Sequence, residues 1–150
     1  MSDLFQFEQD FVESLRCIPM AVRLKLDTCG VKLKLTHWHQ FNLEERQKLL
    51  QLPCKNAPDI AHYEQYLQGL VEKYTGTPAS RLKIDPHPPW LEEQSIPPTV
   101  LEKAATVSVT IPLEKWANLS SLQRFILIKL SRPGHENKNF LPALKEFNLI

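Results

Sequence analysis

The sequence predicts a mainly α-helical protein, folded as a single compact domain over residues 1–150 with an internal pseudo-duplication. Three observations predict this class. Apolar residues recur at helical spacing in several segments, next to side chains that cap helices. Only 4 of the 150 residues are glycine whereas 12 are proline, which favours rigid helix starts over tight turns. The chain also matches itself at a fixed offset, which indicates two copies of one unit.

The repeat relates residues 18–52 to residues 96–130 without a gap, at an offset of 78. Eleven of the 35 aligned positions are identical, where average composition gives roughly 2 by chance. The identical pairs are Ile18/Ile96, Pro19/Pro97, Val22/Val100, Lys25/Lys103, Thr28/Thr106, Val31/Val109, Leu35/Leu113, Trp38/Trp116, Arg46/Arg124, Leu49/Leu127 and Leu52/Leu130. We interpret the two segments as copies of one unit.

Each copy begins with a proline and a short helix. Pro19 and Pro97 suit the first turn of a helix, where the missing N–H costs nothing. Apolar residues follow both prolines, and Gly30 can end the helix of the first copy.

The next part of each copy has the pattern of a half-buried strand. Apolar residues alternate with polar residues or proline over 31–35 and over 107–113. Pro112 confines the second segment to a ribbon edge or a strand end. If a pseudo-dyad relates the copies, the two segments can pair as a small antiparallel two-stranded β-ribbon.

A tryptophan, a helix cap and a second helix complete each copy. Asn42 and Ser120 each have a Glu or Gln three residues on, which forms a capping box and predicts helices over 43–52 and 121–131. The second helix is the more apolar, so we expect it to be central. Trp38 and Trp116 are interpreted as equivalent buried side chains that fill the core between the two halves. Arg46 and Arg124 are expected to pair with a carboxylate or a helix end.

Other segments connect or flank the copies. Apolar spacings of three and four predict a helix over 59–74. The loop over 77–98 holds six prolines and is expected to be ordered by contacts, with Trp90 as its anchor. Residues 5–15 are expected to form an aromatic strap or a helix, and residues 140–147 a short last helix.

Several classes of function are excluded by composition. The net charge of +1 offers no global field for nucleic acid or an anionic membrane. The longest apolar run, over 125–128, is far shorter than the ~20 residues of a membrane span. The start of the chain lacks the basic region of a signal peptide, so we expect a cytoplasmic protein. The four glycines cannot form a phosphate-binding loop.

The cysteines are expected to be free thiols, in the core or functional. Cys17, Cys29 and Cys54 have no close partner at the spacing typical of zinc ligands. Transient binding of a metal by Cys17 and Cys54 stays open as an alternative, should folding bring their segments together. No catalytic residue is predicted.

A dense polar block follows the most apolar helix. Its cationic and hydrogen-bonding residues are Lys129, Arg132, His135, Lys138 and Asn139. Residues packed in this way at a helix end often serve as caps and turns. The same block also suits recognition of an anionic ligand or an acidic partner segment. Both interpretations remain open.

These segments together resemble one known family. The matching stretches are Leu15–Met20, Arg23–Asp27 with Gly30, Pro53–Cys54, Gln123–Phe125, Lys129–Arg132 and His135–Phe147. The chain is similar over nearly its whole length to the nitrate-reductase-associated proteins. The resemblance implies an accessory role for bacterial assimilatory nitrate reductase rather than catalysis. It agrees with the lack of any motif for molybdopterin, flavin or nicotinamide.

The leading hypothesis is therefore a non-enzymatic maturation or stabilising factor, without a cofactor of its own, that binds nitrate reductase or its precursor. The expected partner-binding residues are Arg132, His135, Glu136, Asn137, Lys138, Asn139, Phe140 and Lys145. One alternative is a carrier of metal or molybdenum cofactor that uses Cys17, Cys54 and His135. Another is a small metabolite enzyme with a pocket lined by His135 and Glu136. The oligomeric state is not predicted.

Overall fold

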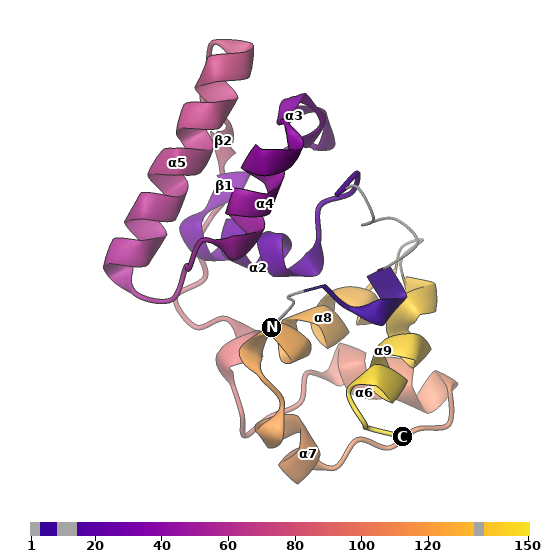
Figure 1. Ribbon diagram of the computed structural model, residues 1–150. Coiled ribbons are helices and arrows are strands. Elements are labelled where there is room, and N and C mark those ends of the chain that lie inside the picture. The colour runs from indigo at the N-terminus through magenta and orange to yellow at the C-terminus, as the bar shows by residue number, and fades with distance from the viewer. Residues whose placement is uncertain (1–3, 9–14, 134–136) are drawn as a thin grey trace. The chain divides into compact units, whose positions relative to one another are not determined.

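The computed structural model describes residues 4–8, 15–133 and 137–150. By its internal contacts the chain divides into two compact units, Met1–Ile84 and Asp85–Ile150. The described residues are mostly helical, with one small two-stranded antiparallel ribbon, so the predicted fold class is confirmed (Figure 1). Whether the units form the one domain expected from the sequence stays a prediction, and each unit is described by itself.

Unit 1 is built from short helices around one long one. Its elements are η1 (Gln6–Glu8), α2 (Met20–Cys29), β1 (Val31–Lys32), α3 (Leu35–Gln40), α4 (Leu43–Gln51), α5 (Ala57–Thr75) and β2 (Ser80–Arg81). Helix α5 packs against α2 and α3, and α2 also contacts α4 (Figure 1). The core includes Val22, Trp38, Leu49, Tyr63 and Leu67, all fully buried.

Helix α2 begins and ends as its flanking residues require. Pro19 is the N-cap, one residue before the helix rather than inside its first turn. Gly30 ends the helix with a left-handed φ of 75°, and its N–H donates to the Leu26 carbonyl at 2.9 Å. A Cβ on this glycine would lie 2.7 Å from Cγ1 of Ile84. Both the positive φ and this close approach favour glycine.

The ribbon exists, but the predicted strand partner is wrong. Val31 pairs with Arg81 and Lys32 with Ser80, so β1 lies beside β2 and not beside residues 107–113. Two hydrogen bonds from Gln68 of α5 hold the residue before β2: the Ala79 N–H donates to Oε1 at 2.7 Å, and Nε2 donates to the Ala79 carbonyl at 3.1 Å. The contact with α5 therefore places β2 at the edge of β1.

The two predicted strands are also shorter than expected. The first ends at Lys32, and helix α3 begins at Leu35. Residues 107–113 contain no strand; Pro112 is instead the N-cap of helix α7 (Leu113–Asn118). Proline has no N–H for a strand ladder but suits the residue before a helix, so it favours this outcome.

Unit 2 is arranged around its most apolar helix. Its elements are η2 (Pro89–Leu91), α6 (Pro98–Thr106), α7, α8 (Ser121–Ser131), η3 (Asn137–Asn139) and α9 (Phe140–Glu146). Helix α8 contacts η2, α6, η3 and α9, which confirms its central position (Figure 1). The Trp90 ring packs edge-on against Phe125 at 5.0 Å between centroids, so this tryptophan anchors its loop as expected.

The predicted capped helices are confirmed with small shifts at their ends. Asn42 and Ser120 each accept a hydrogen bond from the backbone N–H three residues on, and both capping boxes are complete. Helix α5 starts two residues earlier than predicted because Asn56 caps it, and it ends before the left-handed Gly76. The expected last helix forms as α9. Of the expected N-terminal strap, η1 is described, and residues 9–14 lie outside the described part.

Matching contacts occur 78 residues apart. Arg46 donates to the Trp38 carbonyl at 3.1 Å, and Arg124 donates to the Trp116 carbonyl at 3.3 Å. Both tryptophans are fully buried in the chain. The prediction that each arginine meets a helix end is thus confirmed, since α3 and α7 end next to these carbonyls. A duplication as the origin of this correspondence stays a prediction, as does the role of the tryptophans between the halves.

Candidate partner-binding site

The candidate site lies where α8 ends and α9 begins. Helix α8 ends at Ser131. Its C-cap is Arg132, whose N–H donates to the Lys129 carbonyl at 3.3 Å, and a proline follows directly. Arg132 has an extended backbone, because helical geometry is disfavoured for a residue that precedes a proline. The chain therefore leaves the helix at this residue. The chain is described again from η3, which continues into α9.

Helix α9 is fixed by one apolar face. Phe140, Ala143 and Leu144 are buried and Phe147 is nearly so. Their spacing of three and four residues places them on one side of a helix, which packs against α8. After α9, Asn148 takes a left-handed φ of 61°, and the Leu149 N–H donates to the Leu144 carbonyl at 2.9 Å. This turn closes the helix end.

Three exposed cations remain around this anchored helix: Arg132, Lys138 and Lys145. We call them the C-terminal basic surface. Lys145 lies in the last turn of α9, where the helix dipole favours a positive charge. No ion pair involving these three side chains occurs in the described part of the chain. No carboxylate of the described residues therefore neutralises these three charges.

The other residues predicted for this site have mixed positions. Asn139 is half-buried as the N-cap of α9. Phe140 is only 1% exposed, so it anchors α9 and cannot contact a partner from there. His135 and Glu136 lie outside the described residues, and the side chain of Asn137 is not described either. Lys129, also in the predicted polar block, places its Nζ 5.2 Å from the centre of the Phe125 ring.

A buried arginine positions α8, and hence this surface. Arg124 is 4% exposed and lies in α8. Its guanidinium donates to the carbonyls of Trp90 (2.7 Å), Leu119 (2.6 Å), Trp116 (3.3 Å) and Ala117 (3.4 Å). The last carbonyls of a helix have no partner within it, so Arg124 satisfies the end of α7 and ties the loop at Trp90 to α8.

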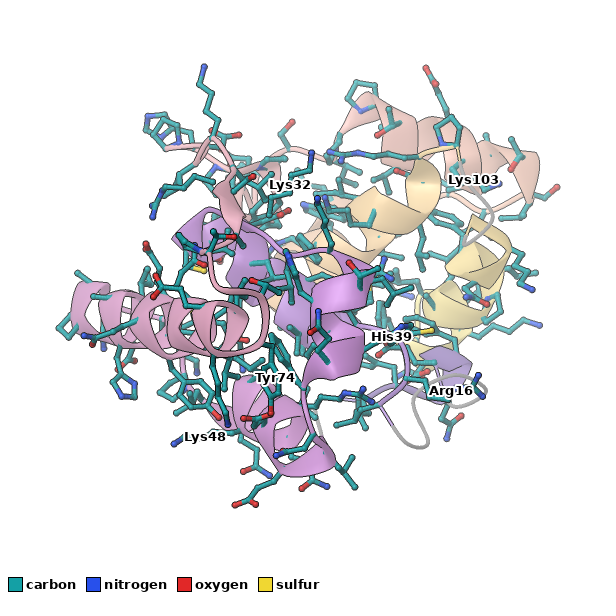
Figure 2. All side chains as sticks on the ribbon, turned by 90° about the horizontal axis from the view of Figure 1, so that it is seen from above. Arg16, Lys32, His39, Lys48, Tyr74 and Lys103 are labelled. Atoms are coloured by element: carbon teal, nitrogen blue, oxygen red, sulfur yellow. The ribbon has the colours of Figure 1, made fainter. Side chains whose placement is uncertain are left out.

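The equivalent arginine of unit 1 holds the segment before α2. Arg46 and the indole N–H of Trp38 both donate to the Leu15 carbonyl, at 3.1 and 2.6 Å. His39 Nε2 donates to the next carbonyl, that of Arg16, at 3.0 Å (Figure 2). Leu15 has a left-handed φ of 53°, and these bonds hold it in that conformation.

Two thiols of unit 1, those of Cys29 and Cys54, are poor candidates for metal ligands or nucleophiles. Burial raises the pKa of Cys29 to about 12, and burial raises the pKa of Cys54 to about 11. Both side chains are therefore neutral thiols near pH 7, whereas metals and electrophiles need the thiolate. Cys17 is half-buried. No group of three or more His, Cys, Asp or Glu residues that could hold a metal occurs in the described ranges.

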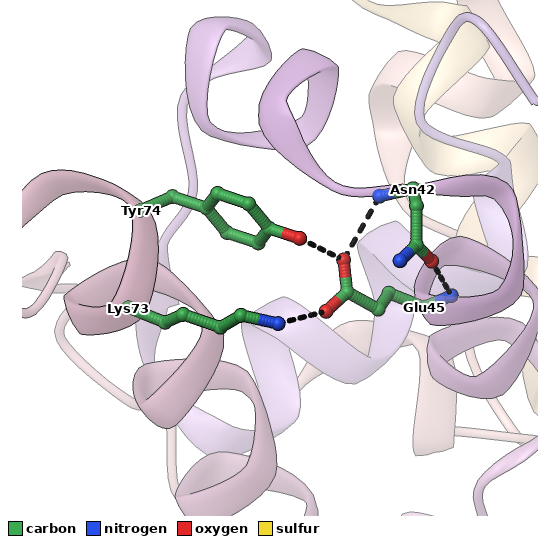
Figure 3. A network of polar contacts seen from close by, with 4 residues as sticks. All are labelled: Asn42, Glu45, Lys73 and Tyr74. Atoms are coloured by element: carbon green, nitrogen blue, oxygen red, sulfur yellow. Dashed lines mark hydrogen bonds and ion pairs between the residues drawn. The ribbon is translucent and has the colours of Figure 1, made fainter.

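Unit 1 also contains a network of polar contacts around Glu45, of which the sequence predicts only the capping box. Glu45 of α4 accepts hydrogen bonds from the Tyr74 hydroxyl at 2.7 Å and from Lys73 Nζ at 3.2 Å, both on α5 (Figure 3). It also accepts from the Asn42 N–H at 2.9 Å. Glu45 is 8% exposed, so the network ties the start of α4 to the end of α5 at a nearly buried carboxylate.

The network makes the stability of unit 1 depend on pH. Burial alone would raise the pKa of Glu45, but the hydrogen bonds from Tyr74, Asn42 and Lys73, with the charge of Lys73, hold it below its ordinary value of 4.5. A carboxyl whose pKa is lower in the folded state stabilises the fold above its unfolded pKa. That contribution is lost as the pH falls through the folded pKa.

We expect Glu45→Gln to lower the free energy of unfolding by about 1 kcal/mol at neutral pH, because the bonds to a charged carboxylate are lost. Gln123 forms the same capping box in α8, so the glutamine should keep the cap. The difference from the natural chain should shrink in acid below the ordinary pKa, in urea unfolding at several pH values. Glu44→Gln, an exposed change in the same turn, is the control. A constant difference at all pH values would contradict this account.

The fold and this site define a small helical protein with a cationic helix end and no metal cluster among its described residues. No helix in that part of the chain is both long and apolar enough to cross a membrane. A family described as conserved nitrate reductase-associated protein matches residues 4–147, so the chain belongs to this family. The resemblance seen in the sequence is thereby confirmed. No curated protein and no solved structure matches the chain.

Proposed function

We propose that this protein is a non-catalytic accessory factor required for the activity of assimilatory nitrate reductase, and that it acts by contact with the reductase or its precursor. Membership of a family associated with nitrate reductase is the observation that carries the proposal. The C-terminal basic surface supports it, because exposed cations around an anchored helix suit contact with another protein.

One feature of unit 1 favours this proposal over a carrier of metal. Cys54, one of the residues expected to serve a carrier, is half-buried, and burial raises the pKa of its thiol to about 11, which disfavours metal transfer through it.

Direct binding tests the proposal. Purified chain and purified nitrate reductase, both mature and stripped of its molybdenum cofactor, are mixed and followed by analytical ultracentrifugation. We expect a complex with at least one form of the reductase, because the factor acts by contact. Tighter binding to the stripped form would indicate a maturation role, and tighter binding to the mature form a stabilising one. No complex with either form would contradict the proposal.

A further inference from the structure

The outer face of α9 combines positive charge with exposed apolar surface. Lys138, Pro142 and Lys145 follow one another at steps of four and three residues, so they share one side of the helix and of the turn before it. All three are exposed, and Leu141 beside them is half-buried. The buried face of α9 points the opposite way, so this outer face is free of the core.

Among the residues that the structure describes, this face carries little negative charge. The one acidic residue of α9, Glu146, is half-buried and already has an interaction within the chain. Neither lysine forms an ion pair in the described residues. Lys138 lies in η3, the turn that leads into α9, and Lys145 lies in the last turn of α9. The face therefore presents one positive charge just before α9 and one near its end, with apolar atoms of Pro142 and Leu141 between them.

We propose that this face binds an acidic segment of nitrate reductase in which two carboxylates flank an apolar side chain. The carboxylates pair with Lys138 and Lys145, and the apolar side chain packs on Pro142 and Leu141. This inference rests on the proposed function and adds the chemistry of the partner surface. Charge complementarity selects the acidic segment, because like charges facing each other would oppose binding and opposite charges speed association.

A pair of double variants tests this assignment in the full chain. Lys138→Glu with Lys145→Glu reverses the proposed contact, whereas Lys32→Glu with Lys34→Glu makes the same charge change on exposed lysines of unit 1. Affinity for purified reductase is measured by isothermal titration calorimetry at low and at high salt. Circular dichroism confirms that each variant melts as the natural chain does.

We expect the α9 variant to bind about tenfold more weakly or worse, and the unit 1 variant to bind as the natural chain does. High salt should weaken binding of the natural chain more than that of the α9 variant, since salt screens exposed charges. Lys138→Gln with Lys145→Gln should give an intermediate loss, because it removes attraction without adding repulsion.

Other outcomes separate the two proposals. If the natural chain binds and the α9 variant binds equally well, the acidic contact is wrong while the accessory function stands. Equal losses in both double variants would show that net charge alone matters, and would also overturn the assignment to α9. If the natural chain does not bind the reductase at all, the accessory function itself is contradicted, and this inference with it.

Discussion

Replacement of Arg124 by methionine is expected to lower the free energy of unfolding by about 3–5 kcal/mol. The side chain is 4% exposed and donates to four carbonyls, two of them at 2.7 Å or less. Methionine fills a similar volume but donates nothing, so buried carbonyls at the end of α7 and at Trp90 lose their partner. Each such buried group costs about 1–3 kcal/mol when unsatisfied.

Urea unfolding followed by circular dichroism measures this loss. Arg132→Met is the matched control, because it removes an exposed arginine eight residues further along the chain and should change stability by no more than about 0.5 kcal/mol. Arg124→Lys should recover only part of the stability, since an ammonium group cannot span carbonyls in the way a planar guanidinium does. If Arg124→Met and Arg132→Met had equal, small effects, the described hydrogen bonds would not stabilise unit 2.

Signals within a few residues of one another predicted most of the helices. The capping boxes at Asn42 and Ser120 mark the starts of α4 and α8, and spacings of three and four apolar residues mark α5. A cap and an apolar face are both local, so the sequence alone reveals them. Gly30, which ends α2 in a left-handed conformation, is a local signal of the same kind.

Contacts between distant residues explain the wrong predictions. Helices α3 and α7 have six residues each, too few to show a helical period, and the alternation before them indicated strands. Carbonyls near their ends, those of Trp38 and Trp116, accept hydrogen bonds from arginines eight residues further along the chain. The partner of β1 depends on the bonds between Gln68 and Ala79, which no pattern in the sequence reveals.

For the polar sites, too, local features could be predicted from the sequence and contacts between distant residues could not. Exposure of Arg132, Lys138 and Lys145 follows from their charge. Burial of Phe140 follows from its spacing to Ala143, Leu144 and Phe147, and the same spacing argues against Phe140 as a contact residue. The Glu45 network could not be found in this way, because its partners lie 28 and 29 residues away.

The largest functional effect is expected when nitrate reductase is produced without this chain. If the factor is required for maturation or stability, the reductase made alone should have low activity even with an artificial electron donor, which bypasses natural electron delivery. Low molybdenum content in that sample would assign the defect to cofactor loading. Normal molybdenum content would assign it to a cluster or to assembly.

The most direct measurement is therefore nitrate reductase activity with an artificial donor, with molybdenum determined on the same samples, after expression with and without this chain. The Arg124→Met chain provides a matched sample in which unit 2 is destabilised, and it should fail to restore activity. We predict high activity with the natural chain and low activity without it. Equal activity and equal molybdenum content in the two samples would contradict the accessory function.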